Sequence, residues 1–470
     1  MSNVKPGKIP EPQEFYGFRE PVNYLDLRFK GLREEVVREI SQVREEPEWM
    51  LQIRLRAFRH FIERPIPTWG PDLSGIHFDD FYYYAAPSNK KEPAKTWAET
   101  PAIGQRTFAR LGIPEMEQKF LAGMGAIVES QEIYNRLQKD LKDQGVIFTT
   151  VGNAVKNHPD LIKKWFGRII PFNDNKFAAL NTAFWSDGPF IYVPPGVKIA
   201  KPLESYFRIN AKNVAQFERT LLIADTGAEV SYLEGCSASQ YDSAMLHAAV
   251  VEIVALKDAT VRYHTMQNWN KDVYNLVTKR AHAYENAKVS WVNLESGSRL
   301  NMKYPSTYLL GRGAKTEIYS LAYAGAGQLQ DTGGKAIHLA SDTSSKIISK
   351  SISKDGGRTV YRGLIHVDPR AHNVKSAVRC DALLIDADSQ TATFPYEEIE
   401  ADDASCSHEA SVNKISDESL FYLESRGINE NDAISMVVNG FAEEITKELP
   451  PVQAVEINRI LQLEMAGSVG

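Results

Sequence analysis

The sequence predicts a mainly β protein built around a β-solenoid, with a helical region on either side of it. Between about residues 173 and 415, short runs that alternate apolar and polar residues, such as FIYVPPGVKI and VVEIVALKD, are separated by turn residues, which is typical of strands. A weak unit of the form small–x–β-branched–x–aromatic recurs at steps of 31, 28 and 27 residues, beginning at Ala228, Ala259, Ala287 and Ala314. Short strands at a near-constant period indicate a solenoid, in which each turn buries its apolar face against the next.

The repeat has a fainter continuation, which we expect at Ser345 and Ala371. An antiparallel sandwich is the alternative fold for this region. It is the less favoured one, because sandwich strands seldom keep one period over so long a stretch. We therefore assign residues 171–415 to a solenoid core.

Residues 1–170 are predicted to form an α-rich N-terminal domain. Apolar residues recur at three- and four-residue steps in EPEWMLQIRLRAFRHFIE (46–63) and in GAIVESQEIYNRLQKDLKDQ (125–144), and a further helix is expected at HPDLIKKWFGRI (158–169). The first fifteen residues, MSNVKPGKIPEPQEF, are polar and proline-rich. They have neither the apolar core of a secretory signal nor the arginine-rich character of an organelle leader.

Residues 416–470 are predicted to be helical again. Ser416 can cap a helix whose first turn is acidic, and Gly427 stands where a C′ glycine ends one. Asn429 can cap the next helix. Pro450 and Pro451 end that helix and begin the last one. This region is expected to cap the solenoid.

The composition excludes several classes of function. The chain is 43% hydrophobic with a net charge of −6, which does not fit a nucleic-acid binder, and no apolar run reaches the roughly 18 residues that cross a bilayer. Three cysteines without a CxxC pair indicate free thiols in a reducing cytoplasm. No GxxxxGK[ST], GxSxG or HExxH motif occurs, so we expect neither an ATPase nor one of these hydrolase types.

Cys380 and the pair His408–Glu409 form the first candidate site. Cys380 lies in the strand-like run SAVRCDALLID, and His408 follows 28 residues later, one repeat length on. If residues one repeat apart stack on neighbouring turns, Cys380 faces His408 or its neighbour at about 4.8 Å. A thiolate, an imidazole and a carboxylate suit iron and iron–sulfur clusters. The alternative is a buried structural cysteine beside a satisfied polar pair.

Cys236 marks a second candidate site. It lies eight residues after Ala228, as Gln267 does after Ala259, so the two should stack. Further polar or aromatic residues in strand-like runs could line a polar channel inside the solenoid: Arg208, Asn210, Trp269 and Lys279. Lysine or arginine nearby is expected to lower the thiol pKa and favour the reactive thiolate. The alternative is a polar outer face with one small core cysteine.

Cys406 stands two residues before His408, on the same side of a strand. It is either a spare ligand or a serine-like loop residue.

These residues carry a resemblance to a known family. The stretches YFRINAKNVAQFERTLLIAD, VSYLEGCSA, TMQNW, VRCDALLID, SHEASVNKIS and LFYLESRGI resemble the SufB proteins of the SufBD family, scaffolds of the SUF system for iron–sulfur cluster assembly. The likeness covers nearly all of the chain from about Gly123. It implies a right-handed parallel β-helix, in agreement with the repeat.

The resemblance also implies roles for individual residues. Cys380 matches the family's essential cysteine, which holds a nascent cluster at the interface with the paralogous SufD chain, and His408 and Glu409 match proposed co-ligands. Cys236 matches the acceptor of persulfide sulfur. The family residues that line the sulfur's route towards its essential cysteine match Arg208, Asn210, Gln267, Trp269 and Lys279. Ser407 stands where some relatives have an acidic residue, which removes one carboxylate ligand and leaves Cys406 as its substitute.

The expected function is therefore a cytoplasmic scaffold that is not itself an enzyme. It would build a transient 4Fe–4S or 2Fe–2S cluster, and reduced flavin is a further cofactor that the family suggests. The partners implied are a SufC-type ATPase on the C-terminal helices, a SufD-type paralogue or a second copy, and a cysteine desulfurase with its sulfur carrier (SufS with SufE or SufU). Neither nucleic acid nor membrane is expected. The alternatives are a SufD-like structural subunit and a polysaccharide-active β-helix enzyme.

Overall fold

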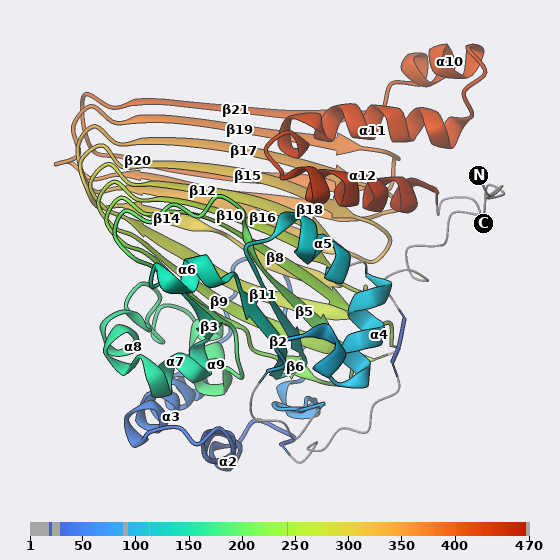
Figure 1. The fold of residues 1–470 in the computed structure, drawn as a ribbon. Helices are drawn as coiled ribbons and strands as arrows, with labels where there is room; N and C mark the ends of the chain where they lie inside the picture. The colour runs from blue at the N-terminus through green and yellow to red at the C-terminus, as the bar shows by residue number, and fades with distance from the viewer. Residues whose placement is uncertain (1–17, 21–28, 88–92, 112, 242, 467–470) are drawn as a thin grey trace.

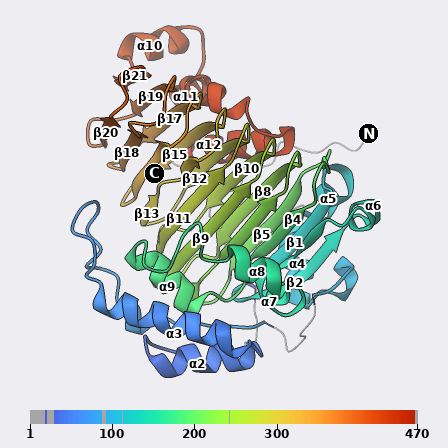
Figure 2. The same ribbon diagram turned by 90° about the vertical axis from the view of Figure 1, so that its left-hand side faces the viewer.

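The repeated strand units fold into a parallel β-solenoid, which confirms the predicted fold class (Figure 1). The structure is a computed structural model and describes residues 18–20, 29–87, 93–111, 113–241 and 243–466. The expectation for the first fifteen residues lies outside these ranges. Two long sheets face each other, and helices lie against both of them (Figures 1 and 2).

The first wall, sheet I, is parallel except for its first pair, β2–β1. Its strands in spatial order are β2 (Gln131–Leu137), β1 (Gly123–Val128), β5 (Leu203–Ile209), β8 (Glu229–Ala238), β10 (Thr260–Asn268), β12 (Lys288–Ser296), β15 (Lys315–Ala324), β17 (Ser344–Ser353), β19 (Lys375–Leu384) and β21 (Ser405–Lys414).

The second wall, sheet II, carries the return strands. In spatial order they are β20 (Gln390–Ile399), β18 (Arg358–Val367), β16 (Leu329–His338), β13 (Leu300–Lys303), β11 (Val273–Ala283), β9 (Met245–Ala255), β7 (Arg219–Ala224), β4 (Pro189–Val193) and β3 (Ile147–Thr150), with β14 (Ser306–Leu309) between β11 and β16 and β6 (Ala215–Gln216) beside β9.

The predicted repeat sets the register of sheet I. The strand pairs Glu229–Thr260, Thr260–Lys288 and Lys288–Lys315 place all four repeat alanines side by side, as expected. The fainter continuation is wrong in register. Lys315 pairs with Ser344 and Ser344 with Lys375, so the position of Ala314 continues at Thr343 and Val374 rather than at Ser345 and Ala371. The turns between strands differ in length, and the period therefore drifts.

Alternate side chains of each strand point between the two sheets. At one register Tyr232, Tyr263 and Trp291 are all buried there, with ring centroids 5.0 Å and 5.2 Å apart. Such aromatic contacts across neighbouring strands stabilise the stack. Two and four residues further along β8, however, the buried side chains are Glu234 and Cys236, so the interior changes from apolar to polar along this strand.

The N-terminal region covers the first turns of the solenoid (Figure 2). Its helical elements are α2 (Glu34–Val43), α3 (Glu48–Glu63), η1 (Phe78–Asp80), η2 (Trp97–Glu99), α4 (Ala102–Arg110), α5 (Ile113–Phe120), α6 (Lys139–Asp143), α7 (Val151–Asn157), α8 (Pro159–Trp165) and α9 (Lys176–Phe184). Apolar faces of α2, α3 and α9 pack on the outer side of sheet II. The helices expected over 46–63 and near 158–169 are confirmed.

The helix predicted over residues 125–144 is wrong over most of its length. This stretch forms the hairpin β1–β2 and only the short helix α6. β1 pairs with β5 and buries Met124, Ala126 and Val128, and the hairpin turns at Glu129, whose φ is +53°. The strand edge of the solenoid thus outweighs the local helical pattern.

The C-terminal helices follow their predicted caps. They are α10 (Asp417–Ser425), α11 (Glu430–Thr446) and α12 (Pro451–Ala466). Ser416 and Asn429 each accept a hydrogen bond from the backbone N–H three residues on, and Gly427 has a φ of +83°. Buried apolar residues of α11 and α12 pack on the outer face of sheet I. Among the described residues, every helix is too short or too polar to pass through a bilayer.

Buried histidines predict an acid-sensitive fold. Burial lowers the pKa of His264 and of His338 to about 4, with smaller contributions from Arg262 and His366 respectively. The unfolded chain, with histidine pKa values of about 6.5, binds more protons between these limits, so this stability is complete above about pH 6.5 and is lost as the pH falls towards 4. At pH 5 each of these histidines should make the free energy of unfolding roughly 2 kcal/mol lower than it is at neutral pH.

Urea unfolding at pH 7.5 and pH 5 measures this effect. The His338→Gln variant should lose less stability between the two pH values than the parent protein, whereas a variant at the exposed His372 should behave as the parent does. Equal pH dependence in His338→Gln and the parent would contradict the assignment.

Candidate functional site

Cys380 and His408 meet at the last turn of the solenoid. The Cys380 Sγ lies 3.7 Å from the His408 Nε2. Both side chains point between the sheets, from β19 and β21. Strand pairing sets Cys380 opposite Ala410 and Val378 opposite His408, so the contact is diagonal rather than along one rung. The predicted juxtaposition holds, although the true offset between the paired residues is 30, from 380 to 410, and not 28.

Glu409 does not join this pair. It follows His408 on β21 and is exposed. In the strand register it lies opposite Arg379 of β19, on the outer face of sheet I. Adjacent residues of a strand face opposite ways, which separates this carboxylate from the thiol. The carboxylate beside His408 is instead Glu397 of β20, whose Oε1 lies 3.3 Å from the His408 Nδ1.

The pair His408–Glu397 has the geometry of a metal-binding imidazole. A carboxylate beside Nδ1 favours a proton on that nitrogen, and in the neutral ring this leaves the lone pair on Nε2. In this site that lone pair is directed towards Cys380. The sequence held no spacing signal for Glu397, because it arrives from the opposite sheet.

The Cys380 thiol is neutral at pH 7 when no cation is bound. Burial raises its pKa to about 12, an effect that interaction with Tyr361 partly offsets. Cys406 lies on the same inner face of β21 and is half-buried, and burial raises its pKa too, with Glu397 adding to the rise. A metal cation would reverse both effects, because coordination to a thiol deprotonates it.

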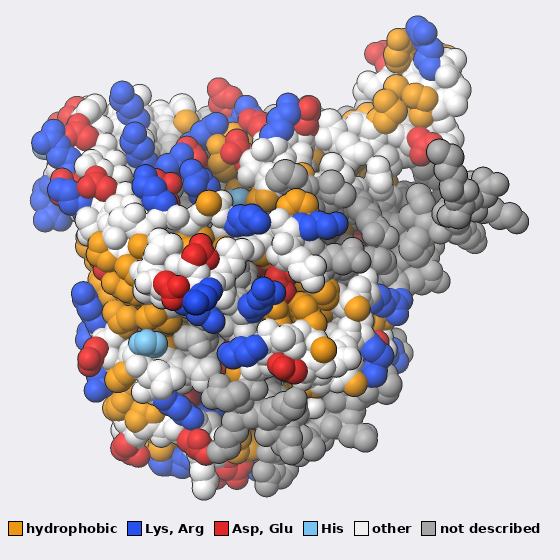
Figure 3. Space-filling model, in the orientation of Figure 1, with side chains coloured by type: hydrophobic (Ala, Val, Ile, Leu, Met, Phe, Trp, Pro, Cys, Tyr) orange, Lys and Arg blue, Asp and Glu red, His pale blue; other side chains and the backbone are white. Residues whose placement is uncertain are grey.

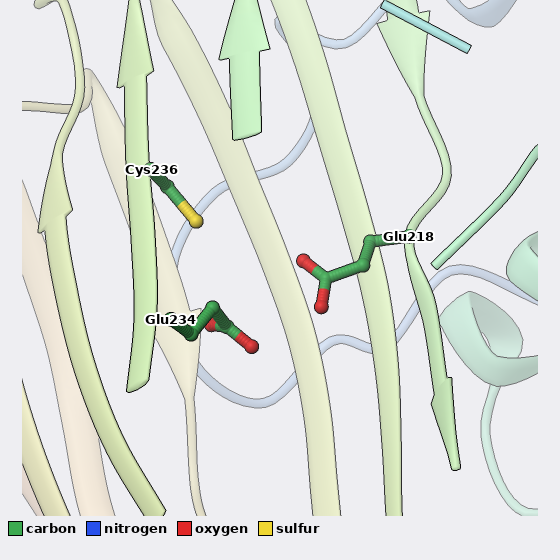
Figure 4. Close-up of side chains that lie close together, drawn as sticks. All are labelled: Glu218, Glu234 and Cys236. Carbon is green, nitrogen blue, oxygen red and sulfur yellow. The ribbon is translucent and has the colours of Figure 1, made fainter. Parts of the chain in front are cut away.

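Cys236 lies in a second, fully enclosed cluster. It pairs with Gln267 as predicted, and both are buried between the sheets. Glu234, two residues before it, accepts a hydrogen bond from the Lys279 Nζ at 2.9 Å, and Lys279 also donates to the Thr265 Oγ at 2.7 Å. Glu218 reaches the cluster from the opposite sheet (Figure 4).

Nearby lysines lower the pKa of Cys236 as predicted, but the expected net result, a reactive thiolate, is wrong. Burial raises the pKa of Cys236 well above its usual range, and the charges of Glu234 and Glu218 add to the rise. Lys279 and Lys303 offset it only in part. Without a bound cation this thiol is therefore protonated. The prediction failed because the sequence does not show that the two carboxylates lie beside Cys236.

Two of the residues predicted for the interior lie outside it. Arg208 donates hydrogen bonds to the hydroxyls of Ser237 and Ser239 and to the Phe18 carbonyl, and Asn210 donates to the Glu20 carbonyl. Ser237 faces away from Cys236, so Arg208 belongs to the outer face of sheet I, where it holds residues 18–20.

The other predicted residues are inside. The Gln267 Oε1 accepts a hydrogen bond from Asn275 at 2.6 Å, and the Trp269 ring lies 4.7 Å from that of His247.

A continuous row of polar side chains joins the two sites. The pairing registers place one interior position of six successive strands in line, and all six side chains are buried: Glu234, Thr265, Asn293, Ser320, Ser349 and Cys380. We call this row the polar row. Sequence reasoning missed its middle members. The repeat could have found some of them, since Glu234, Thr265, Asn293 and Ser320 each stand six residues after a repeat alanine.

Comparisons with known proteins find relatives over nearly the whole chain. The chain matches the family descriptions "SUF system FeS cluster assembly, SufBD core domain" over residues 207–441 and "SufBD protein N-terminal region" over residues 110–204. Proteins named "Iron-sulfur cluster assembly SufBD family protein" from Staphylococcus saprophyticus, Staphylococcus aureus and Staphylococcus haemolyticus are each 51% identical to it over 464 residues, 98% of this chain and 99% of theirs. The likeness thus extends over the N-terminal region as well.

Proposed function

Because the chain belongs to the SufBD family of iron–sulfur cluster assembly proteins, we propose that it is a SufB-type scaffold on which sulfur and iron are joined. The contact between Cys380 and the free nitrogen of His408 carries this proposal. Thiolate and imidazole suit iron–sulfur clusters, and the site lies at the open end of the solenoid, where iron can reach it. The family gives no support to the alternative of a polysaccharide-active enzyme.

Cys380 and His408 are the proposed protein ligands of a transient cluster, of 4Fe–4S or 2Fe–2S type. Glu397 holds His408 in the binding tautomer and takes the place that we predicted for Glu409. Cys406, on the same inner face, is a further ligand available to the growing cluster. The remaining ligands come from a partner chain.

Sulfur is proposed to enter at Cys236 as a persulfide. Five strand steps of about 4.8 Å separate β8 from β19, so the sulfur has about 24 Å to travel. The chain has only three cysteines, and none stands in the polar row between these two sites. Direct exchange between thiols therefore fails over this distance, and sulfur crosses as sulfide: Cys236–S–SH takes two electrons and one proton to give Cys236–SH and HS⁻. Reduced flavin is the proposed two-electron donor.

The polar row gives the sulfide a path. Hydroxyl and amide groups of its middle members replace part of the hydration that an anion loses inside a protein. Lys279, held between Glu234 and Thr265, supplies positive charge at the start of the row. Gln267 and Trp269 lie beside Cys236 at the start of this path.

Exposed apolar residues mark two surfaces for partners. On α10, the exposed fractions of Phe421 and Tyr422 are 72% and 57%, and this tip stands away from the solenoid (Figure 3). We assign it to a SufC-type ATPase. The last strands, β20 and β21, expose Phe394, Tyr396 and Val412 and end the sheets with free edges. A SufD-type paralogue or a second copy would cover them in a cytoplasmic complex.

Sulfur transfer tests the scaffold role. After incubation of the chain with a cysteine desulfurase, its sulfur carrier and cysteine, mass spectrometry of peptides should find one added sulfur on Cys236. The Cys236→Ser variant should carry none there, whereas Cys406→Ser should resemble the parent protein. Persistent absence of sulfur from Cys236 would instead favour a SufD-type structural subunit.

A further inference from the structure

The cluster around Cys236 contains more potential ligand groups than a sulfur acceptor needs. The Cys236 Sγ and one carboxylate oxygen each from Glu218 and Glu234 lie within 4.8 Å of one another. Cys236 and Glu234 extend from the same strand towards Glu218, which faces them across the interior (Figure 4). The exposed fractions of the three are 2%, 1% and 1%. One thiol and two carboxylates thus converge in a volume that excludes water.

His247 adds a fourth donor with a free lone pair. It is fully buried, and its Nε2 lies 3.6 Å from the Glu218 Oε2 without a hydrogen-bond partner among the described residues. The neighbouring amides fix its tautomer. Asn275 donates through Nδ2 to Gln267 at 2.6 Å and to Asn301 at 2.9 Å, so its Oδ1 must accept from the His247 Nδ1, 2.7 Å away. A proton is therefore on Nδ1, and in the neutral imidazole Nε2 carries the lone pair.

This arrangement is the one that metal-binding histidines use. The ring nitrogen that does not bind the metal donates to an oxygen of the protein, and the other is directed into the site. His408 with Glu397 has the same form at the outer site. In both places the histidine Nε2 faces another candidate ligand, Cys380 at 3.7 Å in the outer site and Glu218 at 3.6 Å in the inner one.

The charges of the interior also leave room for a cation. Glu234 is paired with Lys279, and Glu295 with Lys303. Glu218 has no such ammonium partner: its Oε1 accepts from the Thr220 hydroxyl at 2.7 Å, and its Oε2 has no hydrogen bond. Burial, and then repulsion from Glu234, raise the pKa of Glu218. A divalent ion bound beside Glu218 would compensate the charge of its carboxylate.

We propose that Cys236, Glu218, Glu234 and His247 bind a divalent transition-metal ion of the ferrous type inside the solenoid. Sulfur, nitrogen and carboxylate donors together select Fe²⁺, Co²⁺ or Zn²⁺ over Mg²⁺ or Ca²⁺. The Cys236 thiol loses its proton to the solvent when it coordinates the ion, and no electron is transferred. The inference rests on the proposed function only for its biological meaning, which is that iron is held beside the thiol that accepts sulfur.

The Cys380→Ser/Cys406→Ser variant isolates this site, since Cys236 is then the only thiol in the chain. Titrated anaerobically with Co²⁺ as the probe, the variant should bind one equivalent and show thiolate-to-cobalt charge-transfer absorption. Calorimetry in two buffers of different ionisation enthalpy should report proton release on binding, because a coordinated thiol loses its proton. Added Cys236→Ser should remove the absorption, and added His247→Gln or Glu218→Gln should weaken Co²⁺ binding at least about tenfold.

His338→Gln is the matched control. His338 is also a buried histidine of the interior, but both of its ring nitrogens already have hydroxyl partners, Thr343 and Ser345. When His338→Gln is added to the isolating variant, Co²⁺ binding should stay unchanged. Co²⁺ should also raise the Tm of the protein by the same amount with and without this substitution, which would show that the fold is intact. Absorption that persists without Cys236, or no absorption in the isolating variant, overturns the inference.

The two proposals fail separately. If Cys236 gains sulfur from the desulfurase but the isolating variant shows no cobalt absorption, the metal site is wrong and the sulfur acceptor stands. If the cobalt absorption appears in that variant while Cys236 never gains sulfur, the metal site stands and the sulfur-acceptor role is wrong.

Discussion

Replacement of Cys380 by alanine is expected to abolish cluster formation at the open end of the solenoid. The substitution removes the thiol that lies 3.7 Å from the His408 Nε2, and Cys406, the other thiol of this inner face, makes no such contact with the imidazole. Anaerobic reconstitution of the chain with Fe²⁺ and sulfide, followed by visible absorption, measures the effect. The parent protein should develop a cluster band and transfer the cluster to an apo acceptor protein, and Cys380→Ala should do neither.

Cys236→Ala is the matched control for this experiment. Free sulfide bypasses the sulfur acceptor, so this variant should form the band in the same amount as the parent protein. A band of unchanged size in Cys380→Ala would remove Cys380 from the assembly site.

Filling the polar row with apolar side chains should separate sulfur capture from cluster formation. In Ser320→Val/Ser349→Val two adjacent hydroxyls of the row are lost, and both positions are buried. A sulfide anion would then cross an apolar stretch without a donor, which is costly for a charged species. With sulfur supplied by a desulfurase, we expect persulfide on Cys236 as in the parent protein, and cluster formation reduced at least about tenfold, since each 1.4 kcal/mol of added barrier slows a step tenfold.

Two controls make this result specific. Ser351→Val changes a serine of the same strand that also faces inward, but it stands between Ala322 and Ala382 rather than in the polar row, so it should have little effect. Sulfide added from solution should restore the band in the double variant. Equal cluster yields from desulfurase sulfur in the double variant and the parent protein would show that sulfur travels by another path.

The sequence by itself determined the period of the strands and the ends of the C-terminal helices. The repeat alanines align as predicted, and Ser416, Asn429 and Gly427 occupy the caps that their side chains and backbone favour. These features are local. A strand's alternation and a helix cap depend on a few neighbouring residues, and both can therefore be predicted from the sequence.

Which residues meet was decided only by the tertiary structure. Turns of unequal length shift the register, so Cys380 pairs with Ala410 and reaches His408 on the diagonal. The facing sheet brings Glu397 to His408 and Glu218 to Cys236, from positions that no spacing predicts. The same enclosure reverses the expected effect on Cys236, because in a buried cluster desolvation and two carboxylates outweigh nearby lysines. Charge and burial act through space, and the sequence fixes neither until the turns of the solenoid are in place.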